Sequence, residues 1–247
     1  MDVIKQTQRL DKILAHSGYG TRSEIKLLVK SKVVMVNDKL IKDSGIQVNP
    51  AVDKILVNGD PVFFQAQTYL MMNKPQGVIS ATEDSRERTV LDLLNPPFNH
   101  AALFPVGRLD KDTEGLLLLT DDGKLAHNLL SPKKHVAKTY YAEVSGVVDQ
   151  ADQEAFSQGV ELEDGYVTMP AQLVILVAGD PDLAKDSKIE LTIMEGKFHQ
   201  VKRMFIAVGK KVTFLKRISM GNLKLDEYLA PGEYRELTED ELQQLRC

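Results

Sequence analysis

Five charged side chains lie close together near the middle of the chain, directly before a run of leucines. They are Arg108, Asp110, Lys111, Asp112 and Glu114. Most clusters of this kind are solvated loops. Here Pro105 and Gly107 set the course of the backbone that enters the cluster, and the four apolar residues Leu116 to Leu119 that follow are typical of a strand covered on both faces. A carboxylate anchored in this way can be held rigidly enough for nucleophilic chemistry.

The residues from 107 to 123 also form a longer motif, G-R-L-D-x-x-T-x-G-L-L-L-L-T-x-D-G. This motif resembles the catalytic motif of pseudouridine synthases, in the branch typified by the enzyme that modifies small-subunit rRNA. The resemblance implies that Asp110 is the catalytic carboxylate. It also implies a reaction that requires no metal ion and no organic cofactor.

Two further motifs resemble those of the same family. K-T-Y at 138–140 carries Tyr140, and H-Q-V-K at 199–202 carries Lys202. The resemblance pairs Lys202 with Asp110, although many relatives have Arg at this place. It also implies an apolar wall from Leu215 and a contact of Arg108 with a phosphate or with the extruded base. The substrate pocket is therefore expected to include Arg108, His199, Gln200 and Leu215.

Pseudouridine formation breaks the N-glycosidic bond of a uridine, rotates the uracil and rejoins it through C5. A carboxylate nucleophile can add covalently to the sugar or the base, and it can stabilise positive charge at the anomeric carbon. A neighbouring cation favours the ionised carboxylate, which is the role we expect of Lys202. The ring of Tyr140 can stack on a flipped-out uracil, and its hydroxyl can take part in proton transfer at C5.

Each of these residues also has a simpler interpretation. Tyr140 can be an aromatic residue packed on a strand, which is the interpretation we favour for Tyr141. Asp112 and Asp122 are typical of turn and cap residues. A non-catalytic RNA-binding or ribosome-assembly factor would need only a basic surface, and a glycoside hydrolase would need paired carboxylates such as Asp110 and Asp112. The combination of an Asp, a Tyr and a Lys in three family motifs favours the synthase.

The composition is that of a globular protein without internal disulfides. The chain has 247 residues, of which 43% are hydrophobic and 27% charged. The single cysteine is Cys247, which fits a reducing compartment. The sequence starts without an apolar signal segment and contains no apolar run long enough to span a membrane, so we expect a cytoplasmic protein. The histidines and the cysteine show no zinc-ligand spacing, so no metal is expected.

Charge is distributed unevenly along the chain, although the net charge is −4. Residues 1 to 67 carry ten Lys and Arg against seven Asp and Glu, whereas the remainder carries 21 against 28. The first part is therefore expected to bind RNA phosphates, which gives affinity without sequence readout. The candidate RNA-binding residues are Arg9, Lys12, Arg22, Lys26, Lys30 and Lys32, with Lys74 from the following segment.

Residues 1 to 67 predict a small αβ domain. Leu10, Ile13 and Leu14 share one face of a first helix, and a capping-box pattern at Thr21 and Glu24 opens a second one. Arg22, Lys26 and Lys30 follow at i, i+4 and i+8 and form one basic stripe on the second helix. Short strands follow around residues 33–41 and 55–59. Two helices before a small sheet resemble the S4-like RNA-binding domain that was first described in a ribosomal small-subunit protein.

Residues 68 to 247 predict a larger catalytic domain. We expect an α+β fold, with a mixed, mostly antiparallel sheet flanked by helices. The segment that contains N-K-P-x-G, another feature of the resembled family, predicts a strand, a turn and a strand over 69–80. Further strands are expected at 116–119, 138–144, 171–177, 188–194 and 212–220, and helices near 90–94, at 124–130, at 152–158, at 201–208 and after the Thr238–Glu241 capping box.

The resemblance also narrows the expected substrate. E-G-K-F-H-Q-V-K-R-M-F at 195–205 and P-G-E-Y-R-E-L-T at 231–238 are closest to the small-subunit enzyme. We therefore expect a monomer that modifies a uridine-516-type site in 16S rRNA, with rRNA or a ribosomal assembly intermediate as its partner. Enzymes that act on 23S rRNA share the central motifs, so a large-subunit target is the alternative.

Overall fold

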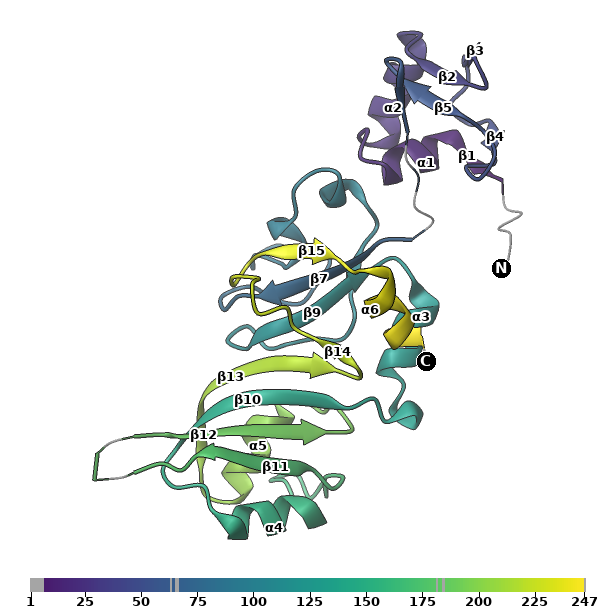
Figure 1. Ribbon diagram of the computed structural model, residues 1–247. Helices are drawn as coiled ribbons and strands as arrows, with labels where there is room; N and C mark the ends of the chain where they lie inside the picture. Colours follow the sequence, from purple (N-terminus) through teal and green to yellow (C-terminus); the bar gives the residue numbers. More distant parts are fainter. Residues whose placement is uncertain (1–6, 63, 65–66, 181, 184, 247) are drawn as a thin grey trace. The chain divides into compact units, whose positions relative to one another are not determined.

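The computed structural model describes residues 7–62, 64, 67–180, 182–183 and 185–246. These residues form two compact units (Figure 1). The first contains the described residues up to Thr68 together with Leu91–Leu103, and the second contains Tyr69–Val90 together with the described residues from Phe104 onward. None of the helices in the described part of the chain is long and apolar enough to cross a membrane.

The first unit packs two short helices against small sheets. Thr21 Oγ1 accepts a hydrogen bond from the Glu24 N–H, and the Glu24 carboxylate accepts one from the Thr21 N–H, so the predicted capping box starts the second helix. Leu10, Ile13 and Leu14 are fully buried in the core of this unit, as their helical spacing predicts. The elements are β1 (Gln8–Arg9), α1 (Leu10–His16), α2 (Arg22–Lys30), β2 (Val34–Val36), β3 (Lys39–Leu40), β4 (Gln47–Val48), β5 (Ile55–Val57) and β6 (Asp60–Pro61).

The segment 91–103 belongs to the first unit, although the sequence-based boundary between residues 67 and 68 assigns it to the second. It contains two 3₁₀ turns, η1 (Leu91–Leu93) and η2 (Phe98–His100), in place of a helix near 90–94. Pro97 lies against Gly18, where an added Cβ would clash with the proline ring. A longer helix does not form because the prolines that follow η1 lack the backbone N–H that a helix needs.

The second unit is built on a nine-stranded mixed sheet (Figure 1). Its strand order is β11-β12-β10-β13-β9-β7-β15, with β14 paired to β13 and β8 paired to β9. Among the described strands of this sheet, β13 and β9 are parallel and the other pairs are antiparallel, which confirms the predicted architecture. The strands are β7 (Tyr69–Lys74), β8 (Phe104–Pro105), β9 (Glu114–Thr120), β10 (Lys138–Ser145), β11 (Gln172–Val177), β12 (Ser187–Ile193), β13 (Lys211–Met220), β14 (Leu223–Lys224) and β15 (Tyr234–Glu236).

β9 is the strand that follows the charged loop, and it is buried along nearly its whole length. Leu116 to Leu119 are fully buried, as expected for a strand covered on both faces. Gly115 pairs with Arg217 of β13 and has a φ of 103°. A Cβ at this position would clash with the Arg217 carbonyl oxygen. Glycine therefore lets β9 approach β13 directly after the loop.

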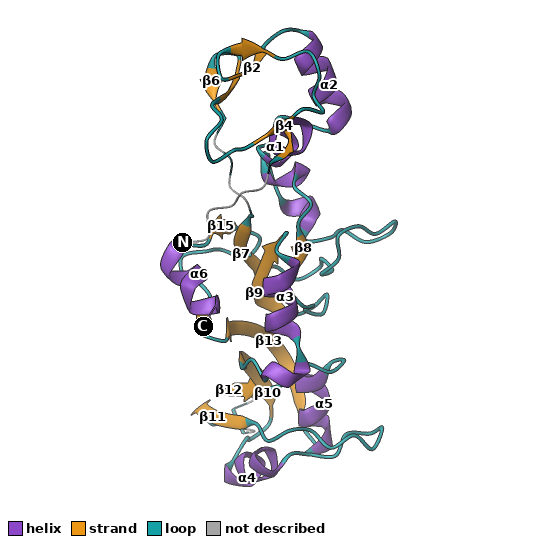
Figure 2. Ribbon diagram, turned by 90° about the vertical axis from the view of Figure 1, so that its right-hand side faces the viewer, coloured by secondary structure: helices purple, strands orange, loops and turns teal. Residues whose placement is uncertain are grey.

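Helices cover both faces of this sheet. Figures 1 and 2 show α5 on one face and α6 on the other. Leu242 and Leu245 of α6 share a hydrophobic core with Leu125 and Leu129 of α3 and with Leu118 of β9. The helices of this unit are α3 (Gly123–Leu130), the 3₁₀ turn η3 (Pro132–Lys134), α4 (Gln150–Gln158), α5 (Gln200–Ala207) and α6 (Glu239–Arg246).

Side chains make the helix caps that the sequence predicts. Asp122 accepts hydrogen bonds from the N–H groups of Lys124 and Leu125, each at 3.0 Å, and so begins α3. The Thr238 N–H donates to Glu241 and the Glu241 N–H donates back to Thr238, which forms the capping box of α6. These caps depend on residues a few positions apart, which is why the sequence reveals them.

Candidate active site

A pocket of about 340 Å³ lies in the second unit beside the charged loop. Its walls come from the loop 107–113, from residues between 130 and 140, from residues between 193 and 201, and from β13. Segments that are far apart in the sequence therefore meet around one space. Among the described residues, no group of three His, Cys, Asp or Glu side chains is arranged to hold a metal ion. The expected site residues that line the pocket are Arg108, Asp110, Tyr140, His199, Gln200 and Leu215.

Asp110 lies next to two nitrogen-bearing side chains. Its Oδ2 is 3.3 Å from Nζ of Lys202, and its Oδ1 is 3.5 Å from Nε2 of His199. The side chains of Asp110 and Lys202 are 27% and 22% exposed. The ion pair is therefore partly withdrawn from water, where attraction between charges is screened less than on an open surface.

Lys202 also binds Asp112, which the sequence had assigned only to a turn. The Lys202 Nζ donates to Asp112 Oδ1 at 2.6 Å, closer than its approach to Asp110. This hydrogen bond holds the pKa of the Asp112 carboxyl below its usual range. The backbone turns at this point, because the Thr113 N–H donates to the Asp110 carbonyl oxygen at 3.1 Å. The turn assignment was incomplete, because Asp112 and Asp110 share one cation.

One face of the sheet forms a wall of the pocket. Lys138 and Tyr140 lie on the same face of β10, because alternate residues of a strand share a face. Tyr140 pairs with Arg217 on β13, and Leu215 lies two residues before Arg217. Tyr140 and Leu215 are 8% and 5% exposed and offer apolar surface, whereas Lys138 and Arg217 bring positive charge. Lys138 begins the K-T-Y motif and Arg217 lies two residues after Leu215, but the motifs alone predict no role for either cation.

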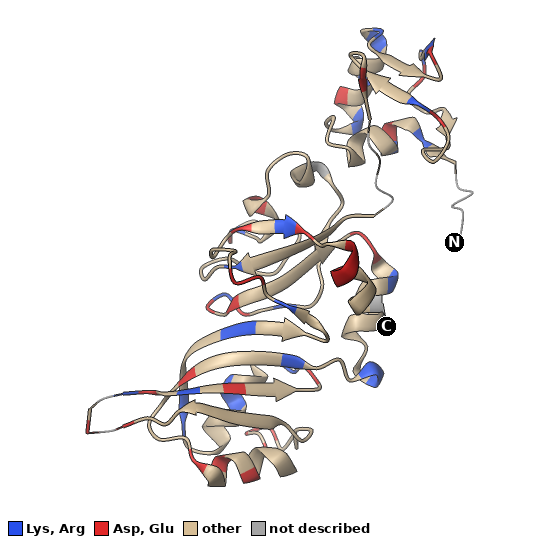
Figure 3. Ribbon diagram, viewed as in Figure 1, with Lys and Arg blue, Asp and Glu red and all other residues tan. Residues whose placement is uncertain are grey.

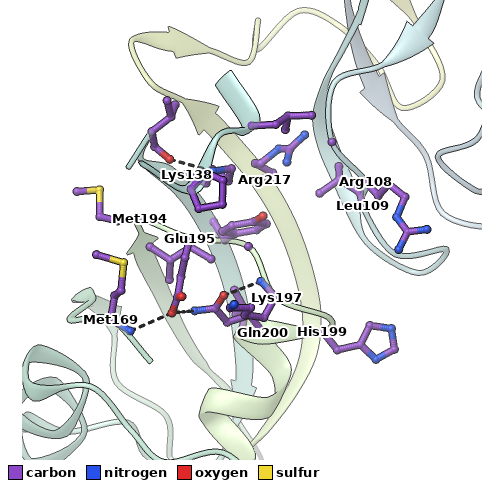
Figure 4. Close-up of a pocket in the computed structure, with 18 of the residues that line it drawn as sticks. Arg108, Leu109, Lys138, Met169, Met194, Glu195, Lys197, His199, Gln200 and Arg217 are labelled. Carbon is purple, nitrogen blue, oxygen red and sulfur yellow. Dashed lines mark hydrogen bonds between the residues drawn. The ribbon is translucent and has the colours of Figure 1, made fainter. Parts of the chain in front are cut away.

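Two other residues considered from the sequence lie away from this wall. Tyr141 is on the opposite face of β10, and its ring lies 6.1 Å from that of Phe214, which confirms the packing interpretation. Arg108 is exposed at the pocket, and Figure 4 shows its guanidinium pointing away from Lys138 and Arg217. The positive charge of Arg108 is therefore open to solvent.

Lys74 does not face solvent, so the RNA-contact prediction for this residue was wrong. It is the last residue of β7 and is fully buried. Its Nζ donates to the carbonyl oxygens of Asp110 and Thr113 at 2.9 Å and of Pro75 at 3.0 Å. Burial lowers the pKa of Lys74 to about 8. Lys74 therefore holds the charged loop against the sheet. The sequence around Lys74 does not reveal this, because the loop that covers it lies more than 30 residues further along the chain.

The segment 77–80 holds the same loop from the other side. The predicted strand is absent here, and Ile79 makes only an isolated bridge. Polar groups of Gly77 and Ser80 form hydrogen bonds with the charged loop instead. The Ser80 hydroxyl accepts from the Leu109 N–H and donates to the Leu109 carbonyl oxygen, each at 3.0 Å. The Gly77 N–H donates to the Lys111 carbonyl oxygen at 2.8 Å. The backbone is thus fixed on both sides of Asp110.

Gln200 organises the segment that leads into α5. Its side chain is buried, its Nε2 donates to Glu195 at 2.7 Å, and its Oε1 accepts from the Lys197 N–H at 2.8 Å (Figure 4). Glu195 also accepts from the Tyr166 hydroxyl at 2.6 Å. Because both ends of the Gln200 amide are engaged, its role is to orient this segment.

An exposed aromatic ring accompanies His199. His199 has a left-handed φ of 48° immediately before α5, and its ring stacks on that of Phe198 at 3.7 Å between centroids. Phe198 is 70% exposed. Exposed aromatic rings are suited to stacking on nucleic-acid bases. Phe198 directly precedes the H-Q-V-K motif, and the motif alone does not predict a role for it.

The first unit carries most of the expected RNA-binding residues, and Figure 3 colours its basic positions. Arg22, Lys26 and Lys30 are exposed on α2, as the predicted stripe requires. Arg9 is held by Asp11 through two hydrogen bonds at 3.0 and 2.7 Å, so its charge is partly neutralised. The six candidates in this unit that are exposed are Arg9, Lys12, Arg22, Lys26, Lys30 and Lys32.

Two family models match the chain. A model of RNA pseudouridylate synthases matches residues 68–207, which include Asp110, Tyr140 and Lys202. The chain belongs to the RNA pseudouridine synthase family. A model of the S4 domain matches residues 8–55, within the first unit. The family resemblance noted in the sequence, and the order of an S4-like domain before a synthase domain, are both confirmed.

Curated pseudouridine synthases are similar to nearly the whole chain. The uncharacterized RNA pseudouridine synthase YtzG of Bacillus subtilis (strain 168) is 54% identical over 234 residues, which cover 95% of this chain and 96% of that protein. Ribosomal small subunit pseudouridine synthase A of Vibrio cholerae is 41% identical over 235 residues, which cover 95% of this chain and 97% of that protein. Ribosomal large subunit pseudouridine synthase B of Bacillus subtilis is 40% identical over 242 residues, which cover 97% of this chain and 96% of that protein.

A solved structure supports the same assignment. A crystal structure of a pseudouridylate synthase superposes with a TM-score of 0.66 and 37% sequence identity, and the match covers 96% of this chain and 99% of that one. The present synthase is therefore an RNA-modifying enzyme, and a mixed sheet forms one wall of its pocket. Its similarity to small- and large-subunit enzymes is nearly equal.

Proposed function

We propose that this synthase converts one uridine of 16S rRNA, at a uridine-516-type site, to pseudouridine, with Asp110 as the nucleophile. The observation that carries this proposal is the placement of Asp110 in the pocket, 3.3 Å from the Lys202 ammonium and on a loop anchored by the buried Lys74. A nucleophile held on a rigid support needs little reorganisation when it attacks.

Four side chains that line the pocket, together with Lys202 beside it, have a part in this reaction. Asp110 adds to the sugar or the base while the bond between N1 and C1′ breaks, and Lys202 stabilises the ionised form of the carboxylate. The bond between C5 and C1′ then forms, and the bond to Asp110 breaks and restores the free carboxylate. C5 releases its proton and N1 gains one. Tyr140 provides a ring for the flipped uracil and a hydroxyl near the atoms that exchange protons. Leu215 completes the apolar wall, and Arg108 contacts the RNA outside the pocket.

The assignment to 16S rRNA rests on the resemblance of the segments 195–205 and 231–238 to those of the small-subunit enzyme. A 23S rRNA target is the second candidate, because the large-subunit relative is 40% identical over nearly the full length. Neither reaction requires a metal or an organic cofactor. We propose that the S4-like unit binds rRNA phosphates through its exposed lysines and arginines, and that the protein acts as a monomer in the cytoplasm on rRNA or an assembly intermediate.

The test uses unmodified 16S and 23S transcripts and 16S-containing assembly intermediates. Each is incubated with the enzyme, and pseudouridine is mapped by carbodiimide adducts that stop reverse transcription. We expect one new stop in 16S rRNA with wild type and none with Asp110→Asn. Asp112→Asn is the matched control, because it removes the other carboxylate that binds Lys202, and it should keep most of the activity.

The outcomes separate the proposals. A new stop in 23S rRNA alone would transfer the target to the large subunit. Equal conversion by wild type and Asp110→Asn would remove Asp110 from the mechanism. Tight rRNA binding without any pseudouridine on all substrates would favour a non-catalytic role in assembly.

A further inference from the structure

Two positive charges at one end of the pocket have no acidic partner in the part of the chain that the structure describes. Arg217 is 2% exposed, and its Nε donates to the Leu116 carbonyl oxygen at 2.8 Å. Its Nη2 is buried and has no hydrogen-bond partner among the described residues. Burying a guanidinium nitrogen without a hydrogen-bond acceptor costs free energy. A ligand that places an acceptor at this end of the pocket would remove that cost.

Lys138 lies beside Arg217 (Figure 4). Its Nζ donates to the Val136 carbonyl oxygen at 2.9 Å, which leaves further donor capacity. Burial and the positive charge of Arg217 lower the pKa of Lys138. Two cations on one wall repel each other, and an anion between them would relieve both the repulsion and the loss of hydration.

The acidic side chains of the pocket are engaged elsewhere. Asp110 lies against Lys202 and His199. Glu195 accepts hydrogen bonds from Tyr166, Gln200 and the Met169 N–H. Neither carboxylate therefore serves as the counterion of Lys138 or Arg217, and no other described residue supplies the missing negative charge.

We propose that Lys138 and Arg217 bind a phosphate group of the nucleotide that enters the pocket. Tyr140 lies two residues from Lys138 on β10 and pairs with Arg217 on β13, so both cations lie next to the residue on whose ring the uracil stacks. This placement rests on the proposed function of the pocket. A phosphate held there would fix the sugar relative to Asp110, because base and backbone of one nucleotide would be bound by neighbouring side chains. The carbonyl groups of uracil are a poorer match, since they are neutral and two cations are present.

The test compares uridine with uridine 5′-monophosphate and uridine 3′-monophosphate. Each is titrated into the full-length protein, and binding is followed by NMR through the backbone amides of β10 and β13. At least one nucleotide should bind wild type about tenfold more tightly than uridine does, which is the effect of a charge-assisted hydrogen bond to phosphate. Lys138→Met should bring that ratio close to one, and Lys138→Arg should retain most of it.

Two further variants keep the test independent of misfolding. Lys188→Met removes an exposed lysine of β12 that does not line the pocket, and it should leave the nucleotide preference unchanged. Arg217→Lys keeps the charge in the wall and should reduce the preference without abolishing uridine binding. Unchanged preference in Lys138→Met, equal loss in Lys188→Met, or equal binding of all three compounds to wild type would overturn the phosphate site.

The readout is also separate from catalysis. If wild type forms no pseudouridine in rRNA but discriminates nucleotides from uridine as expected, the proposed function fails while the phosphate site stands. If wild type modifies rRNA but binds uridine and the nucleotides equally, the phosphate site fails and the proposed function stands. Loss of uridine binding itself in Lys138→Met would assign the cations to the uracil carbonyls instead.

Discussion

Lys202 lies between two carboxylates, at 2.6 Å from Asp112 and 3.3 Å from Asp110. Without this ammonium, the negative charges of Asp110 and Asp112 would no longer be balanced by the cation that they share. Lys202→Met should therefore lower kcat about 100-fold, in the range found when one electrostatic partner is removed from an active site. Steady-state kinetics on the rRNA transcript measure this change.

The conservative variant provides the control. Lys202→Arg should recover much of the rate, because the positive charge returns. In Lys202→Met the pKa of Asp112 should rise towards its ordinary value, because the hydrogen bond that lowers it is gone. Carbon NMR of the Asp side chains reports this pKa. An unchanged Asp112 titration would show that Lys202 does not hold that carboxylate in solution.

Lys74 should titrate far below an ordinary lysine. Its pKa of about 8 compares with 10.5 for an ordinary lysine, because burial disfavours the charged form. Between these two values the folded protein has lost a proton that the unfolded chain keeps. The contribution of Lys74 to the free energy of unfolding therefore rises with pH across this window and is constant below it.

NMR titration of side-chain-labelled lysines measures this directly. One resonance should titrate near pH 8, and Lys74→Met should remove it. Lys188→Met, which removes an exposed lysine, should leave that resonance in place. If every lysine titrates above about pH 10, as free lysine does, the ammonium of Lys74 is not desolvated by the loop.

At the scale of elements, the parallel pairing of β9 with β13 brings the parts of the site together. It places Arg217 and Leu215 beside the strand that follows Asp110, and it needs a residue without a side chain at position 115. Gly115→Ala should destabilise the fold by roughly 2–4 kcal/mol, because an alanine there combines a positive φ with a backbone clash. Chemical denaturation measures the loss.

Gly123→Ala is the matched comparison within the same motif. Gly123 begins α3, its φ is not positive, and an added Cβ meets no atom within 4 Å. Alanine is also the better helix former. This variant should be neutral or slightly stabilising. Equal destabilisation by both substitutions would mean that the close approach of the two strands is not what requires glycine at 115.

At the scale of the whole molecule, binding and chemistry are assigned to different units. The exposed residues Arg22, Lys26 and Lys30 belong to the S4-like unit, whereas the pocket belongs to the second. Replacing all three by Gln should weaken rRNA binding and raise KM with little change in kcat. The slope of log affinity against log salt should become shallower by about 2, because each lost phosphate contact removes about 0.7 for single-stranded RNA.

A charge-conserving triple variant tests whether charge alone matters. Arg22→Lys, Lys26→Arg and Lys30→Arg together should keep both the affinity and the salt slope. Filter binding over a range of salt concentrations measures both quantities. A triple Gln variant with wild-type affinity would move the RNA contact to another surface.

Local patterns in the sequence predict much of this fold. The capping boxes at Thr21 and Thr238 and the cap at Asp122 involve residues two or three positions apart. The apolar run from Leu116 to Leu119 and the alternation in β12 depend on side-chain periodicity alone. Such features are determined by neighbours along the chain, so they are visible before any tertiary contact is known.

What the sequence by itself determined is therefore most of the longer helices and strands, the three motifs and their family. The tertiary structure alone decided that Lys74 is a buried anchor and that Asp112 shares the cation of Asp110. It also decided that Lys138 and Arg217 meet without an acid from the described part of the chain. Each of these facts joins segments dozens of residues apart in the sequence. Whether a charged side chain is solvated, paired or buried is decided by which distant backbone folds over it, and no local pattern records that.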